Sequence, residues 1–191
     1  MQFLRRIKSK HLLILTLIIA AMIFSSSCTQ QQQQEVEKID EPTIKVVTEK
    51  GETKQLNMEE YVAGVVAGEM KADWPQNAYG AQAIIARTFA LKLLKDKGTN
   101  KISGEHEKAQ AYRPQNITDE IKKAVDKTRG EVVTYKGEYI KGWFHSSAAG
   151  QTTSAKVGLA YDKSEPEYIT SVKSPDQHAP EDVKSWEASF S

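Results

Sequence analysis

The 191-residue sequence contains one cysteine, no internal repeat and almost no net charge. A single cysteine cannot form a disulfide bond within the chain. The 26 basic and 25 acidic side chains give a formal net charge of +1, and the lysines form no long runs, so nothing indicates a nucleic-acid partner. With 39% hydrophobic and 27% charged residues, the composition is that of one globular domain with short attachments.

Long hydrophobic runs are also absent, apart from residues 12–24, which only Thr16 interrupts. This run is shorter than the roughly 20 residues that a transmembrane helix needs. It follows four basic residues at positions 5–10 and precedes three serines and Cys28. A basic, then apolar, then small-residue order is typical of a secretory signal peptide, which we assign to residues 1–27.

Cys28 stands directly after this signal, and the arrangement resembles the lipobox of bacterial lipoproteins, in which the cysteine after the cleavage site is acylated. Ser25 stands where a lipobox usually has an aliphatic residue. We expect a lipidated Cys28 that anchors the chain to the outer face of the cell membrane. A retained membrane anchor and plain secretion are the alternatives, and all three place the domain outside the cytoplasm.

Residues 28–42 contain five consecutive glutamines and no apolar periodicity. This composition predicts a flexible tether. Ordered structure is expected to begin near Pro42. Residues 43–191 are expected to form one α+β domain, in which helices pack with short β-hairpins.

Local signals predict the elements of this domain. Asn57 is a good N-cap, and Glu60 three residues later completes a capping-box pattern. Gly98 is a good helix terminator. The expected elements are a hairpin of 43–48 with 53–56, a helix from 57 to about 70, a helix over 77–97, a loop over 102–114, a helix over 119–128, a hairpin of 131–135 with 138–145, and a strand over 168–172.

Glu69 follows Tyr61 and Val65 at helical spacing, so the three side chains share one face. A glutamate is disfavoured at the C-terminal end of a helix, because the macrodipole is negative there. One interpretation is a solvated charge. The other is partial burial, which raises the pKa of a carboxyl group and would keep a proton available for general acid catalysis.

Arg87 lies in the alanine-rich second helix between Ala86 and Thr88. One interpretation is a surface charge whose aliphatic stem follows the helix to water. The other is a fixed pairing, in which the planar guanidinium orients a carboxylate of the protein or of a substrate.

His145, Ser146 and Ser147 begin a polar loop of small residues. A nucleophile with its base, a metal ligand and a plain polar loop are the three hypotheses. Adjacent residues of a strand point to opposite faces, which disfavours a direct pair of His145 and Ser146. A structural zinc usually needs about four donors that include cysteines or several histidines, which disfavours a metal.

Several segments together carry a resemblance to a known family. They are EEYVAGVVAGEM, AYGAQAIIARTFAL, QAY, GEYIKGWFHSSAAGQT and EYITSVKSPDQ, with a tryptophan between the first two. In this order they resemble the core blocks of the SpoIID/LytB family over residues 59–176.

The resemblance implies a peptidoglycan lytic transglycosylase that acts on glycan strands without stem peptides, in sporulation (engulfment) or in cell-wall remodelling. It implies Glu69 as the acid that protonates the leaving oxygen and then, as base, helps the 6-hydroxyl of muramic acid to form a 1,6-anhydro end. The implied partners are peptidoglycan, the membrane through the anchor, and sporulation wall hydrolases; no cofactor is expected. The resemblance also implies which residues form the wall of the site and contact the sugar: Arg87, Gln110, Tyr112, His145, Ser146, Ser147 and Thr152.

The chain departs from the family pattern in three respects. Ala149 and Gly150 replace a double glycine, and no cysteine follows Cys28, so the metal that some members bind is not expected here. Family domains also continue beyond the position of Ser191, which predicts a C-terminally truncated domain. The alternative function is a non-catalytic wall-binding module or an activator of another wall hydrolase, and a zinc hydrolase is a further rival.

Overall fold

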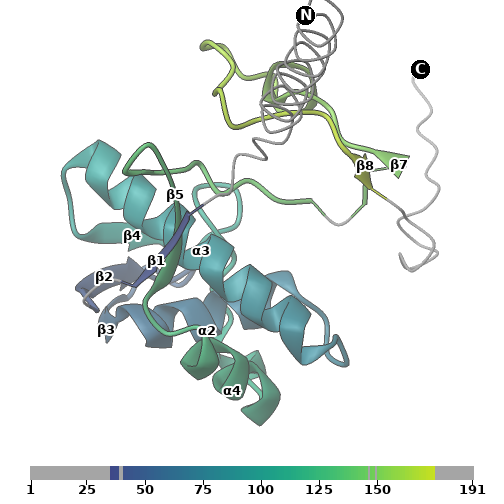
Figure 1. Ribbon diagram of the computed structural model, residues 1–191. Helices are drawn as coiled ribbons and strands as arrows, with labels where there is room; N and C mark the ends of the chain where they lie inside the picture. Colours follow the sequence, from purple (N-terminus) through teal and green to yellow (C-terminus); the bar gives the residue numbers. More distant parts are fainter. Residues whose placement is uncertain (1–34, 39–40, 146, 149, 175–191) are drawn as a thin grey trace, which may run out of the picture. The chain divides into compact units, whose positions relative to one another are not determined.

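The computed structural model of the chain describes residues 35–38, 41–145, 147–148 and 150–174. The expected signal peptide, Cys28, most of the expected tether and Ser146 lie outside these residues. The helices are α2 (Met58–Glu69), α3 (Gln76–Lys97), α4 (Asp119–Lys127) and α5 (Ala155–Gly158), with a 3₁₀ turn at Pro114–Asn116 (Figure 1). The strands are β1 (Glu35–Lys38), β2 (Thr43–Val47), β3 (Thr53–Asn57), β4 (Lys101–Ser103), β5 (Glu131–Tyr135), β6 (Glu138–Tyr139), β7 (Gly150–Gln151) and β8 (Lys173–Ser174).

The first expected hairpin is confirmed, because β2 and β3 pair in antiparallel register. Strand β4 adds to the other edge of β2 in parallel register, with Ile102 opposite Val46. Strand β4 overlaps the first residues of the loop expected over 102–114. The prediction of a loop is therefore wrong for residues 102 and 103. The buried side chains of Ile102 and Val46 account for the pairing, since both enter the core.

Helix α2 begins as its capping signals predict. The side chain of Asn57 accepts a hydrogen bond from the backbone N–H of Glu60 at 2.8 Å, and the Glu60 carboxylate accepts one from the backbone N–H of Asn57 at 3.0 Å. Each bond satisfies a backbone N–H at the start of the helix. Helix α3 likewise ends at Gly98, whose φ of 58° is left-handed, a conformation that costs glycine little.

Strand β5 is held against α3 by Thr88. The Thr88 hydroxyl donates to the carbonyl of Ile84 at 2.7 Å and accepts from the backbone N–H of Val133 at 2.9 Å. The sheet order is β1-β5-β6, so residues 35–38 of the expected tether are a strand. The tether prediction is wrong for these four residues, because the free edge of β5 offers backbone groups for pairing.

The second hairpin is shorter than expected. Strand β6 ends at Tyr139, whereas the sequence predicts a strand up to His145. A Cβ atom on Gly142 would lie 2.9 Å from the carbonyl oxygen of Ile85, so the chain at this point runs against α3 and no longer alongside β5.

The prediction of a strand over 168–172 is also wrong, because regular pairing begins only at Lys173, where β8 pairs with β7. Hydrogen bonds between Thr152 and Val172 continue this contact without a regular ladder.

Helices α2, α3 and α4 pack on one another and on the small sheets, which confirms a mixed α+β fold. Alanine and β-branched residues dominate their contact surfaces. The centre of the core consists of Ile44, Val46, Met58, Tyr61, Val62, Val65, Val66, Ala83, Ala86, Ala90, Ile102, Ile121, Ala124 and Val125.

Candidate active site

Glu69 is the last residue of α2, on the same face as Tyr61 and Val65. Tyr61 and Val65 are fully buried, and the Glu69 side chain is only 8% exposed. The expected partial burial is therefore confirmed, and the interpretation of Glu69 as a solvated charge is wrong.

A crossing segment, residues 104–113, covers the Glu69 face of α2. Its contact with the helix depends on two glycines four residues apart. A Cβ atom on Gly64 would lie 2.2 Å from the ring of Tyr112, and one on Gly68 would lie 2.2 Å from the carbonyl oxygen of Ala111. Glycine at both positions therefore lets the crossing segment reach the helix backbone, where the N–H of Arg113 donates to the carbonyl of Gly64 at 2.9 Å.

The crossing segment gives the Glu69 carboxylate its closest partner. The backbone N–H of Ala111 donates to Oε1 of Glu69 at 2.7 Å. His106 approaches the same oxygen, with its Nδ1 3.5 Å away. No residue in the described part of the chain bonds to Oε2. The contacts that the described residues make with the carboxylate thus orient it through one oxygen.

Gln110 and Tyr112 flank Ala111, whose N–H binds this carboxylate. Both are almost fully buried, at 2% and 8% exposed. The Tyr61 hydroxyl donates to Oε1 of Gln110 at 3.3 Å, and the rings of Tyr61 and Tyr112 stack with centroids 5.8 Å apart. Burial, together with the negative charge of Glu69 and the neighbouring Tyr112, raises the pKa of Tyr61 well above its ordinary value. These residues support the site from inside in this structure.

Glu69 borders a hollow of about 360 Å³ at the end of α2. It is the one carboxylate among the described residues that line this hollow. The other lining residues are Ala67, Gly68, Met70, Lys71, Ala72, Asn116, Thr118 and Ile121.

The loop that follows Glu69 is fixed by Tyr79. Its hydroxyl donates to the carbonyl of Lys71 and accepts from the backbone N–H of Trp74, both at 3.1 Å. The Trp74 side chain stays 39% exposed, so an aromatic surface lies in the segment directly after the acid.

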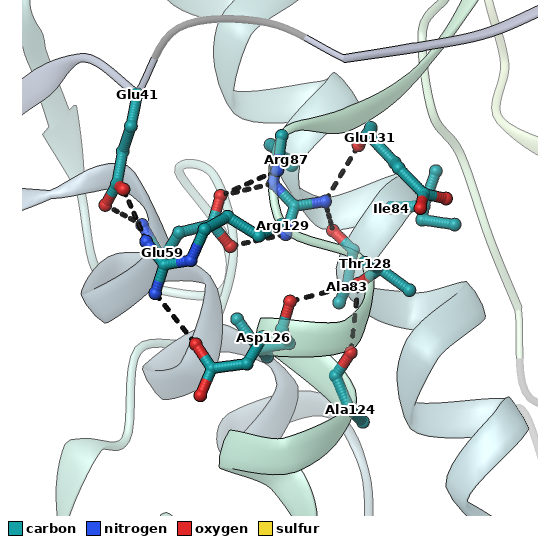
Figure 2. A network of polar contacts seen from close by, with 12 residues as sticks. Glu41, Glu59, Ala83, Ile84, Arg87, Ala124, Asp126, Thr128, Arg129 and Glu131 are labelled. Atoms are coloured by element: carbon teal, nitrogen blue, oxygen red, sulfur yellow. Dashed lines mark hydrogen bonds and ion pairs between the residues drawn. The ribbon is translucent and has the colours of Figure 1, made fainter.

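Arg87 is fully buried, and the interpretation as a surface charge is wrong. Its guanidinium forms a two-pronged ion pair with Glu59, with Nε to Oε1 at 2.8 Å and Nη2 to Oε2 at 2.5 Å (Figure 2). Its Nη1 donates to the carbonyls of Glu131, at 2.8 Å, and Ala83, at 3.4 Å. The carboxylate that Arg87 orients is therefore a residue of the protein, and this structure leaves the guanidinium no exposed surface for a sugar.

The sequence indicates no role for Glu59. In the structure, Glu59 is the carboxylate that pairs with Arg87. It is 4% exposed, and its Oε1 also accepts from the backbone N–H of Gly130 at 3.3 Å. The pair thus joins α2, α3 and the start of β5. Figure 2 shows a second arginine, Arg129, bonded to Asp126 and Glu41 close to this pair.

His145, Ser147 and Thr152 border a different hollow, of about 650 Å³. Its wall includes the aromatic side chains of Trp143 and Phe144. It has no lining residue in common with the hollow at Glu69. The Thr152 hydroxyl accepts from the backbone N–H of Val172 at 2.8 Å, which gives this side chain a structural bond. The structure thus places Gln110 and Tyr112 on either side of Ala111, which binds Glu69, but neither they nor the His145 loop line the hollow at Glu69.

Two further features of the described residues bear on function. No three of their histidine, cysteine, aspartate or glutamate side chains are grouped so that they could hold a metal ion. None of the helices that the structure describes has the length and apolar character needed to cross a membrane.

Comparison with known proteins places these elements in a family. The family model described as "SpoIID: Stage II sporulation protein" matches residues 47–135. That range contains α2, α3 and the crossing segment, with Glu69, Arg87, Gln110 and Tyr112; it ends before the His145 loop.

Curated relatives agree with this match. Stage II sporulation protein D of Bacillus amyloliquefaciens is 32% identical over 146 residues, which is 67% of this chain and 41% of the relative. The amidase enhancer of Bacillus subtilis is 32% identical over 89 residues, which is 47% of this chain and 12% of the relative. An uncharacterized protein of Brachyspira hyodysenteriae is 38% identical over 106 residues, which is 53% of this chain and 28% of the relative.

The chain therefore spans less than half the length of each of these relatives. The match nevertheless covers the helix with Glu69 and the segment that orients its carboxylate. On this evidence, residues 47–135 of the chain are similar to the SpoIID family.

Proposed function

We propose that the chain is a lytic transglycosylase that cleaves the bond between N-acetylmuramic acid and N-acetylglucosamine in peptidoglycan, with Glu69 as its acid and base. One observation carries the proposal: Glu69, whose side chain is nearly buried, lines a hollow, and the contacts that the described residues make with its carboxylate fall on one oxygen. The similarity to the SpoIID family supports a cell-wall role but leaves the reaction open.

The reaction needs one group that first gives and then takes a proton. Protonated Glu69 donates its proton to the bridging oxygen, and the bond from that oxygen to C1 of the muramic acid breaks. The resulting carboxylate accepts the proton of the 6-hydroxyl of the same sugar, while the 6-oxygen forms a bond to C1. The product is a 1,6-anhydro sugar, Glu69 regains its proton, and no water is consumed.

The surroundings of Glu69 suit this reaction better than hydrolysis. Glycoside hydrolases usually use two carboxyl groups, which lie about 5 to 9.5 Å apart. Glu69 is the one carboxylate lining its hollow in the described part of the chain. A reaction in which the substrate supplies its own nucleophile does not need a second one.

The proposed substrate class rests on the family resemblance, and the proposed location rests on the N-terminal sequence. Glycan strands without stem peptides are the proposed substrate, in sporulation or in cell-wall remodelling. A lipid on Cys28 would hold the domain at the outer face of the cell membrane, within reach of these strands.

The decisive experiment is the release of anhydro-muramyl products from peptide-free glycan by the purified wild-type chain and by Glu69→Gln. Glutamine keeps the size of the side chain and removes its titration, so we expect a loss of product formation of about 10²- to 10⁴-fold. Glu52→Gln, an exposed position in the turn between β2 and β3, is the matched control and should keep wild-type activity. Undiminished product formation by Glu69→Gln would overturn the mechanism.

The similarity to an amidase enhancer favours a second candidate, a module that binds the wall or activates another wall hydrolase. Such a module binds glycan and stimulates its partner without Glu69. If Glu69→Gln stimulates an added amidase as well as the wild type does, and neither releases anhydro products, this second function replaces the first.

A further inference from the structure

His106 contacts the proposed acid although nothing in the sequence marks it. It lies in the crossing segment, five residues before Ala111, and its side chain is 72% exposed while that of Glu69 is 8% exposed. Its Nδ1 lies 3.5 Å from Oε1 of Glu69. This distance is within ion-pair range and long for a hydrogen bond, and contacts of this kind often tighten only when the substrate is bound.

The two contacts of Glu69 are made on one side of the carboxylate. Ala111 and His106 both meet Oε1, and Oε2 has no bonded partner in the part of the chain that the structure describes. A single N–H donor would leave the carboxylate free to rotate about its last bond. A second contact on the same oxygen, from Nδ1 of His106 at 3.5 Å, restricts that rotation and so sets the direction of the other oxygen.

We infer that His106 is a positioning residue, which together with the N–H of Ala111 holds Oε1 so that Oε2 is the oxygen that transfers the proton. The inference rests on the proposed function of Glu69. Oε2 carries the proton to the bridging oxygen of the glycan and afterwards takes the proton of the 6-hydroxyl. Oε1 keeps its contacts with Ala111 and His106 throughout, and His106 itself does not touch the sugar.

The loop around His106 is built to hold it in place. The backbone carbonyl of Glu105 accepts from the N–H groups of Lys108, at 3.2 Å, and Ala109, at 3.0 Å. The backbone N–H of Glu105 donates to the Ser103 hydroxyl at 3.2 Å. His106 therefore occupies a closed turn that begins directly after β4. Since it is not among the residues that line the hollow at Glu69, it can orient the acid without filling the space beside it.

The test compares His106→Ala, His106→Asn and His106→Gln with the wild type, by initial rates of anhydro-product release over a range of glycan concentrations. The amide nitrogen of asparagine can take the place of Nδ1, whereas that of glutamine lies nearer to the position of Nε2. We expect kcat to fall about 10-fold in His106→Ala and His106→Gln, because a misdirected acid costs up to about 100-fold. Asparagine should restore kcat to within about threefold of the wild type, and KM should change less than about twofold in all variants.

Two controls separate positioning from folding. Thermal unfolding of the three variants should match that of the wild type, because the His106 side chain is mostly exposed. Glu107→Gln, the exposed next residue of the same loop, should keep wild-type kcat and KM.

The outcomes distinguish this inference from the proposed function. A wild-type chain that releases no anhydro product overturns both. An active wild type with unchanged kcat in His106→Ala, equal losses in the asparagine and alanine variants, or a raised KM at constant kcat overturns only the positioning role.

Discussion

The contact between α2 and the crossing segment can be tested by replacing Gly68 with alanine. The added Cβ would lie 2.2 Å from the carbonyl oxygen of Ala111, and real Cβ atoms essentially never approach other atoms within 3.0 Å. The added Cβ is fixed to the helix backbone, and the oxygen that it meets belongs to the backbone of Ala111. A side-chain rotation therefore cannot relieve the overlap. The crossing segment must move by about 0.8 Å or more, which is the difference between these two distances.

The magnitude follows from the bond that this movement breaks. A shift of that size lengthens the 2.7 Å bond from Ala111 N–H to Glu69 to about the limit of a hydrogen bond. A hydrogen bond to a charged group contributes about 1.5 to 3 kcal/mol, and alanine returns about 1 kcal/mol as a better helix former. We therefore expect Gly68→Ala to lower the free energy of unfolding by about 0.5 to 2 kcal/mol. We also expect a fall in kcat of about 10- to 100-fold, because the acid loses its orientation.

Urea unfolding followed by circular dichroism measures the first quantity, and anhydro-product release measures the second. Gly80→Ala is the matched control, also a glycine within a helix. Its Cβ would lie 3.3 Å from the methyl group of Thr128, so its effect on stability should stay within about 1 kcal/mol of zero. The reasoning is refuted if Gly68→Ala is as stable and as active as Gly80→Ala.

Two further predictions concern the buried polar groups. Arg87→Met leaves the Glu59 carboxylate buried without its partner, so the free energy of unfolding should fall by about 3 to 5 kcal/mol; a urea midpoint close to that of the wild type would contradict this. Folded Tyr61 stays protonated above pH 10 because burial raises its pKa, whereas the unfolded chain loses this proton near pH 10. Stability should therefore decline as the pH rises above about 10, and Tyr61→Phe should show a weaker decline from pH 9 to 11. Equal pH dependence of the two proteins in urea titrations would show that Tyr61 does not contribute.

Elements with local signals could be predicted from the sequence. The capping pair Asn57 and Glu60, and the terminating Gly98, fix the ends of α2 and α3 where the sequence places them. Turn residues between β2 and β3 likewise define the first hairpin. In each case, the residues that decide the structure lie within a few positions of one another.

Elements that depend on a distant partner could not be predicted. Strand β4 has only three residues, and it exists because Ile102 pairs next to Val46, far away in the chain. The burial of Glu69 follows from its spacing after Tyr61 and Val65, but the identity of the group that covers it does not. Ala111 acts through its backbone N–H, which every residue except proline carries, so no side-chain pattern marks it.

The position of Glu69 is explained by comparing two energies. A carboxylate in the last turn of a helix is opposed by the macrodipole by about 0.3 to 1 kcal/mol. The bond from Ala111 N–H contributes about 1.5 to 3 kcal/mol and therefore exceeds that cost. The bond forms only because Gly68 lets the crossing segment approach. Gly68 thus determines whether Glu69 can be kept at this helix end, and it belongs to the site although it has no side chain that reacts.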